Sequence, residues 1–155
     1  VLQGFYFFEE DFDREALARH FDFYEPLTVH ESSLSPCVHS ILAAKLDKMD
    51  QACAFYLRTA RLDLDDYNHE VHEGCHITSM AGTWMSIVEG FGGMRVIKGT
   101  LSFDPKLPEA WQGFTFKINF RERVLKVNVG REKTEITRES GPECTVLLSG
   151  TPIKV

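Results

Sequence analysis

SPCVHSILAAKLDKMDQACAFYLRTA, residues 35–60, carries the clearest helical signal in the first part of the chain. Its apolar residues recur at helical spacing in two runs, one ending near Leu46 and one over 49–60, and each run predicts a helix. Ser35-Pro36 has the form of an N-cap followed by proline at the first helical position. Because only a short connection separates the two helices, they are expected to be antiparallel neighbours.

A third helix is predicted downstream of this pair, from Ile77 to Val88, and the glycines at 90, 92 and 93 are expected to end it. One face of this helix carries only small residues: Ser79, Gly82, Thr83 and Ser86. Small side chains permit a short distance between packed helices. The first part of the chain is therefore expected to be helical and closely packed.

The period of the apolar residues changes to two after Gly99. Short strands are expected at 114–120, 125–129, 134–138, 145–148 and 152–155, the first two forming a hairpin with one buried face. Because helices and strands are segregated along the chain, the sequence predicts an α+β fold in which a small antiparallel β-sheet or half-sandwich follows the helices. The expected domains are 1–98 and 99–155.

The composition favours a globular protein and disfavours several classes of partner. The chain has 155 residues, 43% of them hydrophobic, and its 17 basic and 23 acidic residues give a net charge of −6 without a basic run, so nucleic acid is not expected. Residues 1–8 are apolar but lack a basic leader and meet Glu9 and Glu10 at once, which predicts neither a signal peptide nor a membrane anchor. The four cysteines form no CxxC pair and lie among apolar or small neighbours, which indicates reduced, buried thiols and a cytoplasmic location.

A polar loop before the first of these helices is the leading candidate for a binding site. YEPLTVHESSLS, residues 24–35, places hydroxyls, an imidazole and a carboxylate directly before a helix N-terminus. Backbone N–H groups and the positive end of the helix dipole favour an anion such as phosphate there. The alternative is that Ser32, Ser33 and Ser35 only cap the helix, as serines often do.

His76 is the second candidate, because it lies at the start of the third predicted helix in EGCHITSM, residues 73–80. An imidazole at this terminus can donate to an anion. The alternative is a structural histidine whose ring nitrogens are satisfied inside the fold, which is the more common situation for a histidine beside cysteine and isoleucine.

Metal binding is not expected from the spacing of potential ligands. His30, His39, His69 and His72 show no zinc spacing, and Cys75 with its neighbouring histidines gives only a weak one. The run Asp63, Asp65 and Asp66 lacks the glycine and the final glutamate of a calcium-binding EF-hand loop. A solvated or salt-bridged acidic turn is the better interpretation.

Several long motifs follow one another along the chain: YEPLTVHESSLS at 24–35, TARLDLDDYN at 59–68, EGCHITSMAGTW at 73–84, EGFGGMRV at 89–96 and LSFDPKLPEAW at 101–111. Together and in this order they resemble glycoside hydrolase family 65, the disaccharide phosphorylases of the maltose, kojibiose and trehalose phosphorylase type together with related acid trehalases. The resemblance covers essentially the whole chain. It implies that residues 1–98 are the C-terminal helices of an (α/α)6 catalytic barrel and that 99–155 are a C-terminal β-sheet domain.

For chemistry, the resemblance implies phosphorolysis with inversion, in which a glutamic acid protonates the glycosidic oxygen and inorganic phosphate attacks the anomeric carbon. A phosphorylase needs donors that hold phosphate where an inverting hydrolase needs a second carboxylate. The resemblance assigns phosphate binding to Ser32, Ser33, His76 and Thr28, with His30 and Glu31 as possible supporting residues. No cofactor is implied, and the general acid is expected N-terminal to Val1, so the isolated chain is expected to be inactive.

Within this family resemblance, the HESS form of the loop implies maltose as the substrate, which phosphate would convert into β-D-glucose 1-phosphate and glucose. Two other functions stay open. One is an α-glucoside hydrolase of the trehalase type, in which Glu31 could act as a base. The other is a non-catalytic fragment or interaction domain. The expected partners are the disaccharide, phosphate, the remainder of the barrel and a second copy of the full-length protein. An incomplete barrel is expected to expose an apolar face.

Overall fold

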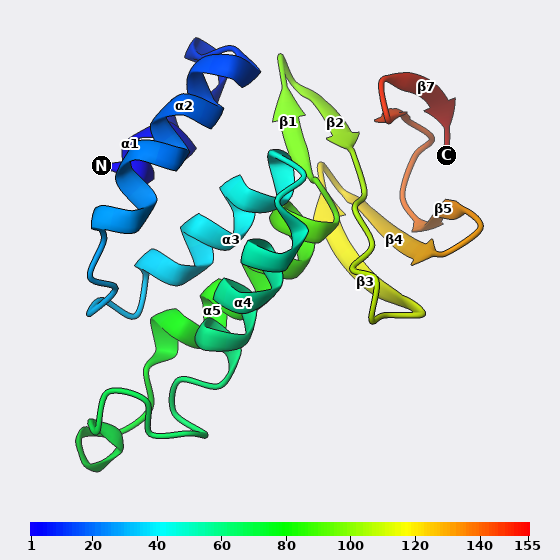
Figure 1. Ribbon diagram of the computed structural model, residues 1–155. Coiled ribbons are helices and arrows are strands. Elements are labelled where there is room, and N and C mark those ends of the chain that lie inside the picture. The colour runs from blue at the N-terminus through cyan, green and yellow to red at the C-terminus, as the bar shows by residue number, and fades with distance from the viewer. The chain divides into compact units, whose positions relative to one another are not determined.

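The computed structural model describes residues 1–155 and divides into two compact units, Val1–Gly90 and Phe91–Val155. The first unit is helical and the second is built of strands (Figure 1). The division lies ahead of the boundary expected between residues 98 and 99, because the strand β1 (Arg95–Ile97) pairs with β2 (Thr100–Phe103). The predicted α+β class, with helices followed by small sheets, is confirmed.

The helical unit contains α1 (Leu2–Phe7), α2 (Arg14–Tyr24), α3 (Ser35–Lys45), α4 (Met49–Ala60) and α5 (Ile77–Met85). Short 3-10 turns lie at Glu9–Asp11, Glu25–Leu27 and Val71–Glu73. After α5 the chain continues as a π-helical segment, Ser86–Phe91, so the glycine at 90 does not end the helix as expected. The three helices predicted from apolar spacing are confirmed, whereas α1 and α2 are not among the predicted elements.

α3 is the central element of the helical unit and is buried on all sides. Every residue from Pro36 to Ala44 is buried, and α3 contacts α1, α4 and α5. A helix without a polar face is typical of a core element. The hydroxyl of Ser40 donates to the backbone oxygen of Ala52 in α4 at 2.8 Å, so this polar group is satisfied inside the core. The two helices α3 and α4 lie side by side, as predicted (Figure 1).

Gly82 allows α5 to lie directly against α3 and α4. A Cβ atom at this position would be 2.8 Å from Cβ of Cys37 and 3.2 Å from Cγ2 of Thr59. Ser79, one turn earlier, donates from its hydroxyl to the backbone oxygen of Thr59 at 2.7 Å. The small-residue face predicted from the sequence is therefore the face on which α5 packs closely.

Replacing Gly82 with alanine is expected to destabilise the helical unit by about 1–3 kcal/mol, because the added methyl group overpacks the contact with Cys37. The matched control is Gly4→Ala in α1, where an added Cβ meets nothing within 4 Å. There the higher helix propensity of alanine should stabilise by roughly 0.5–1 kcal/mol. Thermal unfolding of both variants checks the pair, and equal shifts in the same direction would contradict the close packing at Gly82.

The second unit contains two small sheets. One has the order β1-β2-β6-β7, with β6 at Thr145–Leu148 and β7 at Thr151–Lys154. The other has the order β3-β4-β5, with β3 at Gly113–Phe120, β4 at Arg123–Gly130 and β5 at Thr134–Ser140. All strand pairs are antiparallel except β2 with β6, which is parallel and makes the first sheet mixed.

The period-two pattern positions the core of this unit. Phe116 and Ile118 of β3 are buried, as are Leu125, Val127 and Val129 of β4, while the residues between them face outward or are half-buried. β3 and β4 pair in register from Gly113 with Gly130 to Phe120 with Arg123. The predicted hairpin and the three later strands are confirmed, with differences of one or two residues at their ends for most of them.

The cysteines and the surface differ in part from expectation. All four cysteines are free thiols, but only Cys37 is buried, and Cys75 is exposed because it lies in the polar loop ahead of α5. The expectation of four buried thiols is therefore wrong.

In the helical unit several large apolar side chains are exposed, among them Val29 at 74%, Leu64 at 77% and Ile77 at 70%. Each helix is too short or too polar to span a lipid bilayer.

Candidate functional site

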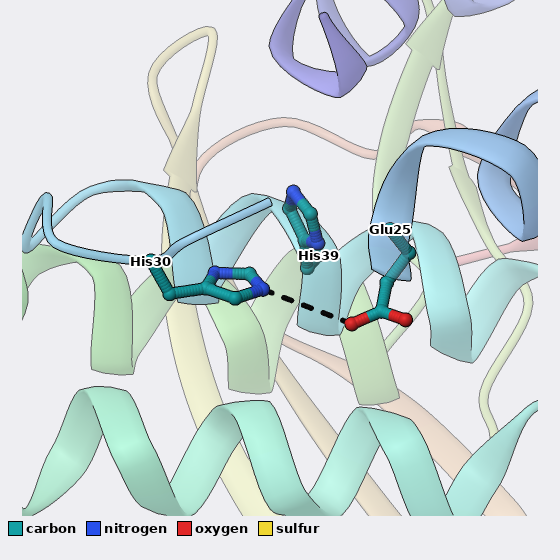
Figure 2. A group of neighbouring side chains, drawn as sticks. All are labelled: Glu25, His30 and His39. Carbon is teal, nitrogen blue, oxygen red and sulfur yellow. Dashed lines mark ion pairs between the residues drawn. The ribbon is translucent and has the colours of Figure 1, made fainter. Parts of the chain in front are cut away.

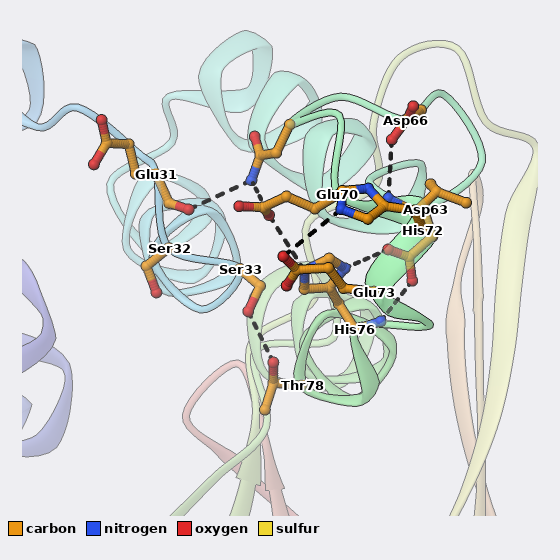
Figure 3. A network of polar contacts seen from close by, with 12 residues as sticks. Glu31, Ser32, Ser33, Asp63, Asp66, Glu70, His72, Glu73, His76 and Thr78 are labelled. Atoms are coloured by element: carbon orange, nitrogen blue, oxygen red, sulfur yellow. Dashed lines mark hydrogen bonds and ion pairs between the residues drawn. The ribbon is translucent and has the colours of Figure 1, made fainter.

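The polar loop before α3 and the first turn of α5 meet through their side chains. The hydroxyls of Ser33 and Thr78 lie 2.9 Å apart and form a hydrogen bond in which either oxygen can donate. Figure 3 shows these two side chains pointing toward one another, with His76 close to the same turn. The structure therefore brings Ser33 to the helix terminus that carries His76, although the two segments are distant in sequence.

The hydroxyls of Ser32 and Ser35 form local hydrogen bonds in the loop ahead of α3. The N-cap of α3 is Leu34 and not the predicted Ser35, and this residue makes no side-chain cap hydrogen bond. The hydroxyl of Ser32 accepts from the backbone N–H of Leu34 at 3.2 Å, and the hydroxyl of Ser35 donates to the backbone oxygen of Ser32 at 3.4 Å. Simple capping, the alternative interpretation of these serines, is thus not what the structure contains.

His76 is held by two carboxylates from the segment between α4 and α5. Its Nδ1 lies 2.5 Å from Oδ1 of Asp63, and its backbone N–H donates to Oδ2 of the same residue at 2.8 Å. Its other ring nitrogen, Nε2, lies 3.4 Å from Oε2 of Glu70. Figure 3 shows the imidazole between these two side chains. The ring is fixed at the N-terminus of α5, where the helix dipole also favours negative charge.

The carboxylates favour the cationic form of this imidazole. The hydrogen bond to Asp63 raises the pKa of His76, and the charges of Asp63 and Glu70 add to the rise while partial burial opposes it. The same hydrogen bonds hold the pKa of the Asp63 carboxyl below its usual range. A protonated imidazole donates from both nitrogens. His76 can therefore present an N–H donor with positive charge to an anion.

The side chains of Thr28 and Glu31, two other residues assigned to the site from sequence, do not contact this network. The hydroxyl of Thr28 donates to the backbone oxygen of Tyr24 at 2.9 Å, which is a local contact within the loop. The carboxylate of Glu31 points away from His76 in Figure 3, and only its backbone oxygen joins the network by accepting from the amide of Asn68 at 3.4 Å. Their proposed roles at phosphate therefore stay predictions.

His30 lies in the core, within a second cluster that it forms with His39 and Glu25 (Figure 2). The Nδ1 atom of His30 is 3.1 Å from the hydroxyl of Ser35, and its Nε2 is 3.7 Å from Oε1 of Glu25, which is too far for a hydrogen bond. Nε2 of His30 and Nδ1 of His39 are buried without a hydrogen-bond partner. His30 is thus 8% exposed and supports the loop from inside rather than facing the turn of His76.

These three residues are also the group best able to hold a metal ion. One donor atom from each lies within 4.8 Å of the others. A zinc ion with bonds of about 2.0–2.1 Å needs its donors roughly 3.3 Å apart, so the side chains would have to move closer together. Burial lowers the pKa of both histidines, which keeps their imidazoles neutral, as metal ligands must be. The sequence-based expectation of no metal stays a prediction.

His39 should make the helical unit sensitive to acid. Burial lowers its pKa from 6.5 to about 3, with His30 adding to the effect. Below pH 6.5 the unfolded chain therefore binds a proton that the folded chain does not. The contribution of neutral His39 to the free energy of unfolding is complete above that pH and is lost as the pH falls toward 3. Between pH 7 and pH 5 the loss should be about 1–2 kcal/mol. Urea unfolding at both pH values measures this loss. A His39→Leu variant should lose less of its free energy of unfolding between the two pH values, and an equal loss in the variant would contradict the role of His39.

Asp63 and Glu70 contact His76 but were not predicted from the sequence as site residues. Asp63 belongs to the acidic run interpreted as a salt-bridged turn, and this interpretation holds for its neighbour Asp65, which pairs with Arg61 at 2.6 Å. The pairing of Asp63 with His76 spans 13 residues of irregular chain, and no periodic signal predicts it. Glu70 was missed for the same reason. The acidic run itself was the only available signal, and nothing in the sequence links it to the histidine at the start of α5.

Comparisons with known proteins match both units. The model of the "Glycosyl hydrolase family 65 central catalytic domain" matches residues 1–85, and that of the "Glycosyl hydrolase family 65, C-terminal domain" matches residues 94–155. A maltose phosphorylase of Bacillus subtilis (strain 168) is 56% identical over 133 residues, which are 86% of this chain and 18% of that protein. An alpha,alpha-trehalose phosphorylase of Thermoanaerobacter brockii is 41% identical over 100% of this chain and 19% of its own length.

A solved structure from the human microbiome that carries the name of a kojibiose phosphorylase has the same fold. It superposes with a TM-score of 0.94 at 37% identity, over 100% of this chain and 23% of that one. The chain thus spans only about a fifth of the length of the relatives it matches, 18% and 19% for the two phosphorylases above.

Proposed function

Because the chain belongs to glycosyl hydrolase family 65, we propose that it supplies the phosphate-binding side of an inverting disaccharide phosphorylase. The observation that carries this proposal is the imidazole of His76, whose cationic form the neighbouring carboxylates favour. Asp63 fixes this imidazole at the N-terminus of α5, in the same turn as Thr78, whose hydroxyl contacts that of Ser33. Donors of this kind suit a phosphate oxyanion. A site for an activated water would instead need a carboxylate free to act as a base.

In the proposed reaction a phosphate oxygen forms a bond to the anomeric carbon of the sugar while the bond to the glycosidic oxygen breaks. The proton for the leaving oxygen comes from a glutamic acid that we place in a part of the protein outside this chain. His76, Ser33 and Ser32 hold the phosphate, neutralise part of its charge and orient it on the face opposite the leaving group. Attack from the opposite face inverts the anomeric centre, so an α-glucoside gives β-glucose 1-phosphate.

Maltose is the disaccharide we propose as substrate. The B. subtilis maltose phosphorylase is 56% identical, compared with 41% for the T. brockii trehalose phosphorylase, and the HESS form of the loop favours the same choice. The products would be β-D-glucose 1-phosphate and glucose. Inorganic phosphate is a substrate in this scheme, and no cofactor is required.

We further propose that the helical unit completes an (α/α)6 barrel with the rest of the protein. The exposed apolar side chains of this unit, such as Leu64 and Ile77, support the proposal because surfaces of this kind usually mark contacts with another element. The full-length protein is proposed to be a cytoplasmic homodimer. The isolated chain would bind phosphate weakly at most and turn over no disaccharide.

The test is incubation of the full-length protein with maltose, with and without phosphate, while NMR follows glucose and both anomers of glucose 1-phosphate. Phosphate-dependent formation of the β-anomer is the expected result. Release of glucose without phosphate would overturn the proposal in favour of a hydrolase of the trehalase type. Phosphate-dependent turnover of trehalose or kojibiose, but not of maltose, would retain the phosphorylase and reject only the choice of sugar.

A further inference from the structure

Asp63 makes the most specific contact with His76, and it does so with both carboxylate oxygens. One oxygen lies 2.5 Å from Nδ1 of the imidazole and the other accepts from the backbone N–H of the same residue at 2.8 Å. The two contacts fix the side chain and the main chain of His76 together. The carboxylate is only 19% exposed, so water competes little for these hydrogen bonds.

The two nitrogens of the imidazole are therefore not equivalent. Nδ1 is taken by Asp63, so Nε2 is the nitrogen that can donate to a ligand. In this structure Nε2 faces Oε2 of Glu70 at 3.4 Å, and Glu70 is also near the amide of Asn68 at 3.3 Å. Both contacts of Glu70 are long, and its side chain is 44% exposed. Glu70 is thus held weakly at the position where an anion would bind.

The other charged groups around this turn have partners of their own. Glu73 lies 3.9 Å from Nε2 of His72, and Asp66 accepts from the backbone N–H of Val71 at 3.1 Å. Only Asp63 and Glu70 act on the charge of His76. The charge of the His76 imidazole therefore depends on one tightly bound carboxylate, Asp63, and on one weakly held carboxylate, Glu70.

We propose that Asp63 is a positioning residue that holds His76 with its Nε2–H toward phosphate, and that Glu70 occupies Nε2 until phosphate replaces it. The inference rests on the proposed function, because it assigns a ligand to the same imidazole. A carboxylate on Nδ1 selects the orientation of the ring and strengthens the donor on Nε2. A carboxylate on Nε2 competes with the incoming anion. The two acidic residues therefore have opposite effects on phosphate binding.

The first test is Asp63→Asn in the full-length protein, with initial rates measured against phosphate at saturating disaccharide from pH 5.5 to 8. Loss of the charge should raise the KM for phosphate on the order of tenfold near neutral pH. The pH above which this KM rises should move to lower values, because the pKa of His76 is no longer raised by Asp63. Phosphate itself titrates in this range, so the comparison is with the wild-type profile. Asp63→Glu, which keeps the charge, should restore much of the affinity.

The second test is Glu70→Gln, measured at pH 6, on the acid side of the ordinary pKa of a histidine; the remaining contact with Asp63 favours the cationic imidazole there. Removal of the competing charge should lower the KM for phosphate several-fold and leave that for the disaccharide unchanged. The matched control is Glu73→Gln, an exposed acid on the same segment that lies next to His72 instead of His76. It should change neither constant.

The outcomes separate this inference from the proposed function. A wild-type protein whose activity does not depend on phosphate would contradict both the proposed function and this inference. Phosphate dependence in the wild type, combined with a folded Asp63→Asn variant whose phosphate KM and pH profile are unchanged, would overturn the role of Asp63 alone. A higher phosphate KM in Glu70→Gln would overturn the exchange of Glu70 for phosphate. The second variant keeps the proposal testable even if loss of Asp63 prevents folding.

Discussion

Replacing His76 with alanine in the full-length protein is expected to raise the KM for phosphate about tenfold to a hundredfold and to leave the KM for the disaccharide nearly unchanged. The reason is the loss of one charge-assisted hydrogen bond, worth about 1.5–3 kcal/mol, to an anion that binds at the N-terminus of α5. The variant also leaves Asp63 and Glu70 without the imidazole that both contact, so their negative charges add repulsion toward phosphate. Initial-rate kinetics with each substrate varied in turn checks this.

His72→Ala is the control for this variant. His72 is a histidine of the same segment, its side chain is 75% exposed, and its ion-pair contact is with Glu73 rather than with the site. It should leave both Michaelis constants unchanged. Equal effects of the two variants, or a His76→Ala variant that affects only the disaccharide, would show that the imidazole of His76 does not hold phosphate.

Phe116→Ala is expected to destabilise the strand unit by about 3–5 kcal/mol, because it removes a large side chain from a packed core. Phe116 lies in β3, is 8% exposed, and its ring centroid lies 6.2 Å from those of Phe103 and Phe114. The two sheets of this unit supply few other aromatic residues that are equally buried. Hydrogen exchange of the amides in β3, β4 and β5 of the full-length protein measures the loss directly as a lower free energy of opening.

Asn119→Ala in the same strand is the matched control, since Asn119 is exposed on the opposite face. It should change the free energy of opening by no more than about 0.5 kcal/mol. If Phe116→Ala exchanged no faster than this control, the register between β3 and β4 that buries Phe116 would be incorrect.

The periodic part of the fold could be predicted from sequence because each element carries its own signal. The apolar rhythm over 35–60 gives α3 and α4, and alternation over 114–129 gives the hairpin of β3 and β4. β1 and β2 were not predicted, because runs of three and four residues are too short to establish a period. The parallel pairing of β2 with β6 could not be predicted from the sequence either, because the two strands are not joined by a short turn.

The candidate site depended on the family resemblance more than on the residues themselves. Membership of glycosyl hydrolase family 65 is confirmed, and the motifs containing Ser33 and His76 meet at α5. His30 lies in the same motif but is buried, because its side chain is directed to His39 and Glu25. Sequence position alone does not tell which side of a loop faces a ligand. Contacts between distant carboxylates and a ring nitrogen, such as that of Asp63, need the folded chain.

A crystal structure of the full-length protein soaked in phosphate shows whether His76 and Ser33 bind the anion. We predict a phosphate ion at the N-terminus of α5, with one oxygen about 2.7–3.0 Å from Nε2 of His76, another within hydrogen-bond distance of the hydroxyl of Ser33, and Glu70 turned away. At a phosphate concentration that saturates the reaction, an ion bound elsewhere, with Glu70 still on Nε2, would contradict the account.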